Sequence, residues 1–276
     1  MTRRMRSIAA ALVAALLPGT AAAQSADDIV GLRAGMSFDE VVSLVEQRDD
    51  VTLVETAEQW VRQSHGIPTR QLLRGSNGVA CVEGEKALRA GGHVVCDTMR
   101  GRFEARKEVT NEIMVAFIGM PGEERAAIVW RRLVFPEAQA PTVAGLVEAL
   151  TQKYGAPRVQ AMDSGYYSMS HRPGTTALNW LYDPSGTSIQ GNDSLLSRCV
   201  NGPKPWFSAK HSWNGGCGLT IRAEIVPQPG SALLAQELNV SVLNQRDLLL
   251  ALGQFDADLK AAVEQQAQGA TVKPEL

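Results

Sequence analysis

Four cysteines are the residues of this chain whose type and spacing most clearly predict chemistry. They are Cys81, Cys96, Cys199 and Cys217. An even number of cysteines in an exported protein is typical of disulfide bonds, and three pairings are possible. The local pairing, Cys81–Cys96 with Cys199–Cys217, closes loops of about 15 and 18 residues, each worth roughly 3 kcal/mol of stabilisation. The other two pairings would join the two halves of the chain. A zinc site is disfavoured because the sequence has no C-x-x-C or H-x-x-x-H spacing.

The segment between Cys199 and Cys217 is the strongest candidate for a binding surface. It belongs to residues 183–218, a stretch rich in Gly, Ser, Asn and Pro that is too long for an ordinary connection. Aromatic side chains carry much of the energy of interfaces, and a clamped loop loses less entropy on binding. The residues expected to bind are Lys204, Trp206, Phe207, Lys210, His211 and Trp213. The alternative is that Trp206 and Phe207 fill the core beneath the loop.

Motifs for catalysis are missing from the sequence. It contains no G-x-S-x-G elbow, phosphate-binding P-loop, dinucleotide-binding fingerprint or EF-hand loop, and its four histidines occur singly. We therefore expect no catalytic residues, no metal and no cofactor, and a binding or scaffold role. The alternative function is a periplasmic hydrolase with a non-standard site around His211, Asp193 and Ser194.

The first 23 residues have the pattern of a secretory signal peptide. Three arginines come before an apolar run at residues 8–17, and alanines fill positions 21–23. As a helix, the apolar run would span about 15 Å, half of a bilayer's hydrocarbon thickness, which disfavours a membrane anchor. The sequence therefore predicts an exported protein, periplasmic or secreted, that is cleaved after Ala23.

Charge and composition exclude two further classes. The chain has 27 basic and 29 acidic residues and is 45% apolar. Removal of the three leader arginines leaves 24 basic against 29 acidic groups, a net charge of −5. This composition is too apolar for disorder and too acidic for nucleic-acid binding. The expected partner is an envelope protein or a small ligand, and no transmembrane segment is expected.

A first helix-plus-hairpin unit is predicted within residues 24–138. Ser37 and Glu40 have the spacing of a capping box, and apolar residues then recur at helical spacing to about Gln47. Further along, two β-rich runs at 112–118 and 126–135 flank a turn, which predicts an antiparallel hairpin.

A second unit is predicted within residues 139–265, followed by a flexible tail at 266–276. Its expected elements are a helix from Thr142 to Gly155, a strand at 177–182, a hairpin at 219–226 and 233–243, and a helix at 245–265.

The two units have similar spacing. The helix starts Phe38 and Val143 are 105 residues apart, and the first hairpin strands begin near Ile113 and Leu219, 106 residues apart. We therefore expect an α+β fold of two similar helix-plus-antiparallel-sheet units in tandem, stapled by disulfides. The alternative is one α+β domain whose hairpins look alike.

The start of the first unit resembles a known family. Residues 31–41, G-L-R-A-G-M-S-F-D-E-V, are similar to the opening of SmpA/OmlA-type small outer-membrane lipoproteins and of the related β-lactamase-inhibitor-like folds. The resemblance implies a short helix packed on a small antiparallel sheet, and a non-enzymatic, protein-binding role. The chain departs from the lipoproteins because it lacks the cysteine that accepts the lipid.

Overall fold

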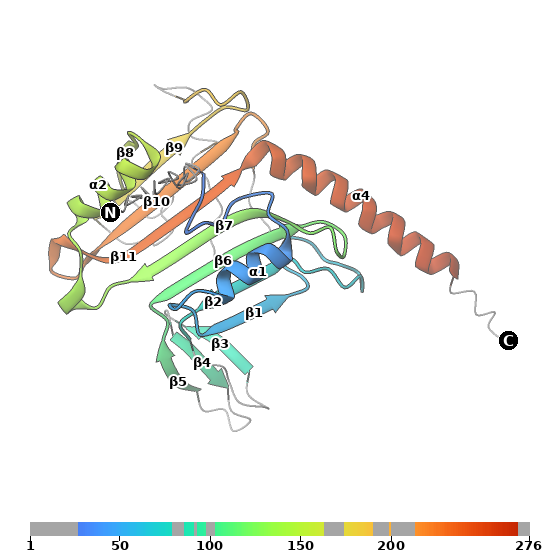
Figure 1. The fold of residues 1–276 in the computed structure, drawn as a ribbon, viewed down its shortest axis with the longest axis horizontal. Coiled ribbons are helices and arrows are strands. Elements are labelled where there is room, and N and C mark those ends of the chain that lie inside the picture. The colour runs from blue at the N-terminus through green and yellow to red at the C-terminus, as the bar shows by residue number, and fades with distance from the viewer. Residues whose placement is uncertain are drawn as a thin grey trace, which may run out of the picture.

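The computed structural model describes residues 27–78, 86–90, 93–97, 103–162, 174–189, 199 and 213–269 (Figure 1). Its helices are α1 (Phe38–Glu46), α2 (Val143–Tyr154) and α4 (Gln245–Gly269), with a short 3-10 turn at Glu137–Gln139. Among the described helices, none combines the length and the apolar character needed to cross a membrane.

One antiparallel sheet of eight strands forms the body of the protein. Its spatial order is β1 (Leu53–Ala57), β2 (Leu72–Ser76), β6 (Asn111–Ile118), β7 (Arg125–Val134), β11 (Ser231–Asn244), β10 (Leu219–Gln228), β9 (Thr175–Leu181) and β8 (Arg158–Met162). A smaller sheet contains β3 (Lys86–Ala90), β4 (His93–Asp97) and β5 (Phe103–Glu108), which follow β2 in the chain. Helices and antiparallel strands together confirm the predicted α+β class.

The two predicted units do not form separate sheets. Strands from residues before 135 occupy one side of the large sheet, and strands from residues after 157 occupy the other. The two sides meet where β7 pairs with β11, with Trp130 opposite Ser241. The structure is therefore one continuous sheet, and a tandem division is not evident from it.

Helix α1 begins where the sequence predicts. The Ser37 hydroxyl accepts from the Glu40 amide at 3.3 Å, and the Glu40 carboxylate accepts from the Ser37 amide at 2.7 Å, which completes the capping box. Just before the helix, the Gly35 amide donates to the Ala126 carbonyl at 2.7 Å. This bond fixes the start of α1 against strand β7.

Helix α2 is held at its end by a tryptophan from the sheet. Gly155 stops the helix with a φ of +85°, a conformation that favours glycine. The Gly155 carbonyl accepts from Nε1 of Trp180 at 2.9 Å, and the rings of Trp180 and Tyr154 lie 5.2 Å apart. These contacts dock the last turn of α2 on strand β9.

The large sheet has a different cover on each face. Helices α1 and α2 pack on one face, whose core includes Val41, Val115, Phe117, Leu178 and Ile221. Alternate residues of the strands point to the opposite face, where α4 covers one end. The buried residues of α4 on that face are Leu248, Leu252, Phe255 and Leu259.

Helix α4 is longer than the sequence predicts. It begins at Gln245 as expected but continues past the predicted end at Gln265 to Gly269, so the predicted tail is helical at its start. Figure 1 shows the C-terminal part of α4 running away from the strands.

Candidate functional site

The predicted Cys199–Cys217 disulfide is present. The two Cα atoms lie 5.7 Å apart, and both cysteines are buried in a small cluster with Leu181 and Ile189. The cluster lies at the end of strand β9. Cys81, needed for the other predicted bond, falls outside the described residues, so that bond stays a prediction.

Gln245, the first residue of α4, connects this disulfide to the rest of the fold. Its side chain is fully buried, and Nε2 donates to the Cys199 carbonyl at 2.9 Å and to the Thr220 hydroxyl at 3.0 Å. Its Oε1 accepts from the Asn214 amide at 3.0 Å. One amide side chain therefore joins the disulfide, strand β10 and the start of α4. The sequence holds no local signal for this role, since the partners are distant in the chain.

The backbone around Gly218 closes the same corner. Its amide donates to the Tyr182 carbonyl at 2.7 Å, and a Cβ at this position would collide with the carbonyl of Asp183. The Asp183 carboxylate accepts from the Ser185 hydroxyl at 2.6 Å and from the amides of Ser185 and Thr187 at 2.8 and 2.9 Å. These bonds, the hydroxyl's first, lower the pKa of Asp183. Both ends of the 183–218 segment are thus tied to the sheet.

Most of the predicted binding residues cannot be placed. Lys204, Trp206, Phe207, Lys210 and His211 lie outside the described residues, as do Asp193 and Ser194 of the alternative hydrolase site. The exception is Trp213, which is half-buried and packs against the apolar cluster under α4. Its ring therefore contributes to the attachment of the segment to the fold.

Sequence reasoning missed a set of buried charged residues on the α4 face of the sheet. Arg74 of β2 forms ion pairs with Glu55 of β1 and Glu112 of β6. Burial raises the pKa of Glu112, while the charges of Arg74 and Arg132 act in the opposite direction. The carboxylate of Glu112 is only 3% exposed, so its negative charge depends on the arginines beside it, with Arg74 in direct contact.

A second part of this charged set lies across the middle of the sheet. Arg222 pairs with Glu224 at 2.7 Å, and Arg132 pairs with Glu237 at 3.0 Å. Arg222 and Glu224 are spaced two residues apart, which places both side chains on the same face of β10. That spacing is the one sequence signal for the pair. Because each of these carboxylates is bound to an arginine, the geometry fits structural ion pairs better than a general base.

Metal ligation has no support in the described part of the chain. No group of three His, Cys, Asp or Glu side chains there is arranged to hold a metal ion.

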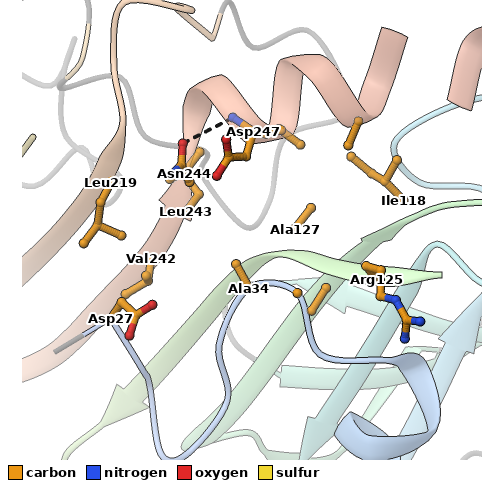
Figure 2. A pocket seen from close by; sticks show the side chains of 14 residues that line it. Asp27, Ala34, Ile118, Arg125, Ala127, Leu219, Val242, Leu243, Asn244 and Asp247 are labelled. Carbon is orange, nitrogen blue, oxygen red and sulfur yellow. Dashed lines mark hydrogen bonds between the residues drawn. The ribbon is translucent and has the colours of Figure 1, made fainter. Parts of the chain in front are cut away.

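Within the described part of the chain, two cavities adjoin α4. One, of about 420 Å³, lies between its first turns, strand β7 and the residues before α1. Figure 2 shows this cavity with the side chains that line it. The other, of about 440 Å³, lies between the later turns of α4 and the loop at 62–65, where Arg62 pairs with Asp256 at 2.7 Å. The first cavity borders Leu219 and Asn244, and so adjoins the corner that Gln245 holds together.

Comparison with known proteins adds no relatives. The chain matches no protein-family model, no curated protein and no solved structure.

Proposed function

We propose that this chain is an exported, non-catalytic binding or scaffold protein of the bacterial envelope. The segment between Cys199 and Cys217 contacts the partner, an envelope protein or a small ligand. The observation that carries the proposal is the clamp at Cys199–Cys217, which the buried side chain of Gln245 ties to β10 and α4.

The physical reason is preorganisation. A loop fixed at both ends loses less conformational entropy when a partner binds, so its contacts give more net affinity. The segment contains two tryptophans, Trp206 and Trp213, and tryptophan is among the residues that dominate interface energies. Its base rests on a continuous eight-stranded sheet, which gives the loop a rigid support.

The binding test is recovery of partners from periplasmic extract by the immobilised protein. Trp206→Ala should reduce recovery, and the double variant Cys199→Ser/Cys217→Ser should reduce it further by releasing the clamp. Leu233→Ala is the matched control, because Leu233 is an exposed apolar residue (77%) of the β10–β11 hairpin, outside the clamped segment. Equal recovery by all four proteins would contradict the proposal.

Export rests on the leader sequence and has its own test. Mass spectrometry of protein from native cells should find a chain that begins at Gln24 and an intact bond between Cys199 and Cys217. An intact leader together with free thiols at these cysteines would overturn the export proposal.

We also propose that the fold consists of two folding units in tandem. In chain order, α1 precedes β1, β2, β6 and β7, while α2 precedes β8, β9, β10 and β11. Across the large sheet, the strands of the first half run in chain order from β1 to β7, and those of the second half run in reverse chain order from β11 to β8. The small sheet is an insertion in the first half. Fragments 24–138 and 139–269, expressed apart and mixed, should reassemble through β7 and β11. Mixed fragments without cooperative unfolding would contradict the two-unit organisation.

A further inference from the structure

The cavity beside the first turns of α4 has the size and walls of a small-molecule site. Its volume, about 420 Å³, falls within the range of ligand pockets, roughly 300–1,000 Å³. Strand residues Val242 and Leu243 and helix residue Leu248 provide an apolar wall. Small residues, Ala126 and Ala127 among them, line the other wall, where larger side chains would fill the space.

Three charged side chains surround this apolar space. Asp27, Asp247 and Arg125 line the cavity, and within the described ranges none of the three forms a side-chain hydrogen bond or ion pair. Asp247 and Arg125 are exposed, and the charge of Arg125 also acts on Glu40 of α1. Figure 2 shows the two carboxylates nearer the end with Val242 and Asn244, and Arg125 at the other end.

The position of Asp247 is fixed by the start of α4. Its backbone amide donates to Oδ1 of Asn244 at 3.2 Å, which caps the helix. This bond fixes the backbone of Asp247 in the first turn, from which its exposed side chain lines the cavity.

We propose that this cavity binds a short apolar peptide with free ends. The ammonium group faces Asp27 and Asp247, the carboxylate faces Arg125, and aliphatic side chains cover the apolar walls. An ammonium group donates hydrogen bonds to carboxylates, and a guanidinium binds a carboxylate in a two-pronged geometry. A purely apolar ligand would use none of the three charges, and an apolar acid would leave both aspartates without a partner.

The test uses three forms of one dipeptide: Leu-Leu, N-acetyl-Leu-Leu and Leu-Leu amide. Each is titrated into ¹⁵N-labelled protein, and the amide shifts of Gly35 and Leu248 are followed. Leu-Leu should bind saturably. The acetylated and amidated forms should each bind roughly tenfold more weakly, because each lacks one charge-assisted contact.

Variants assign each end of the ligand. Asp247→Asn should weaken Leu-Leu and its amide but not the acetylated form. Arg125→Gln should weaken Leu-Leu and the acetylated form but not the amide. Ala251→Leu should abolish all binding, since Ala251 lines the cavity at an exposed helical position that tolerates leucine.

Asp258→Asn is the matched control on the same helix, because Asp258 does not line the cavity. It should bind all three forms as the unmodified protein does. Equal affinity for the three dipeptides, absence of saturable shifts, or unchanged binding by Ala251→Leu would each overturn the proposal.

Discussion

The two faces of the large sheet bury their side chains in different ways. The face under α1 and α2 is filled by apolar residues such as Val115 and Leu178. On the opposite face, one row of neighbouring positions mixes charged, polar and apolar residues: Glu55, Arg74, Met114, Trp130, Ser241, Arg222 and Asn179. The stability of the first face depends on how completely side chains fill its volume, since apolar contacts have no required partner. The stability of the second face depends on ion pairing, because a buried charge needs its counter-ion.

The largest expected effect is on the apolar face. Phe117→Ala should lower the free energy of unfolding by about 4 kcal/mol, because Phe117 is fully buried and its ring lies 4.8 Å from that of Phe38. Urea denaturation followed by circular dichroism measures this loss. Leu250→Ala is the control, since Leu250 is exposed, and should change stability by less than about 0.5 kcal/mol. A loss below about 1 kcal/mol for Phe117→Ala would mean that side chains beneath α1 move to fill the space left by the phenylalanine ring.

The charged face should respond to the loss of one partner and recover when both are replaced. Arg222→Met should cost about 3 kcal/mol, because it leaves Glu224, fully buried, without the arginine 2.7 Å away. The double variant Arg222→Met/Glu224→Leu should regain most of that loss in the same denaturation experiment. If the double variant is as unstable as the single one, pairing of the buried charges is not what determines the stability of this face.

A smaller effect is expected where a single polar contact lies on the apolar face. Trp180→Phe keeps most of the ring but removes the N–H that donates to the Gly155 carbonyl. We expect a loss of about 1 kcal/mol in thermal or urea unfolding. No measurable loss would indicate that water replaces the donor at the end of α2.

The subtlest expected effect is a change in pH dependence. Burial raises the pKa of Glu112 above its usual 4.5, so the folded protein retains this proton at a pH where the unfolded chain has released it. The contribution of Glu112 to stability is thus greatest below pH 4.5 and is lost as the pH rises through the folded pKa.

Glu112→Gln should remove that dependence. Relative to the variant, the unmodified protein should lose stability as the pH is raised from about 4 to about 8, measured by urea unfolding at each pH. Parallel pH profiles for the two proteins would show that Arg74 offsets the cost of burial completely.

Local signals explain which parts of the fold were predictable. The capping box at Ser37 and the β-rich run around Trp130 are local signals, so the bounds of α1 and β7 agree with expectation to within a residue. Strands β1 and β2 were missed because Glu55 and Arg74 interrupt their apolar pattern. The burial of Arg74 is tolerable because it forms ion pairs with Glu55 and Glu112.

The sequence predicts the disulfide of the candidate site but not the hydrogen bonds that attach it to the fold. The spacing of Cys199 and Cys217 predicts their bond, whereas Gln245 gives no local signal. Its partners lie 25 to 46 residues away in the chain, so only the folded structure reveals its three hydrogen bonds. The cavity was missed for the same reason, because its walls come from the segment before α1, from β7 and from α4.

The length of α4 gives the molecule a gradient of amide protection along one helix. Packing ends near Leu259, and beyond it the helix has few tertiary contacts and one exposed ion pair, Lys260–Glu264 at 4.0 Å. An isolated helical segment of this length is marginal in water, since local pairs of this kind add only tenths of a kcal/mol. In hydrogen–deuterium exchange, amides after Lys260 should therefore exchange first as the temperature rises, while those before Leu259 exchange with the sheet.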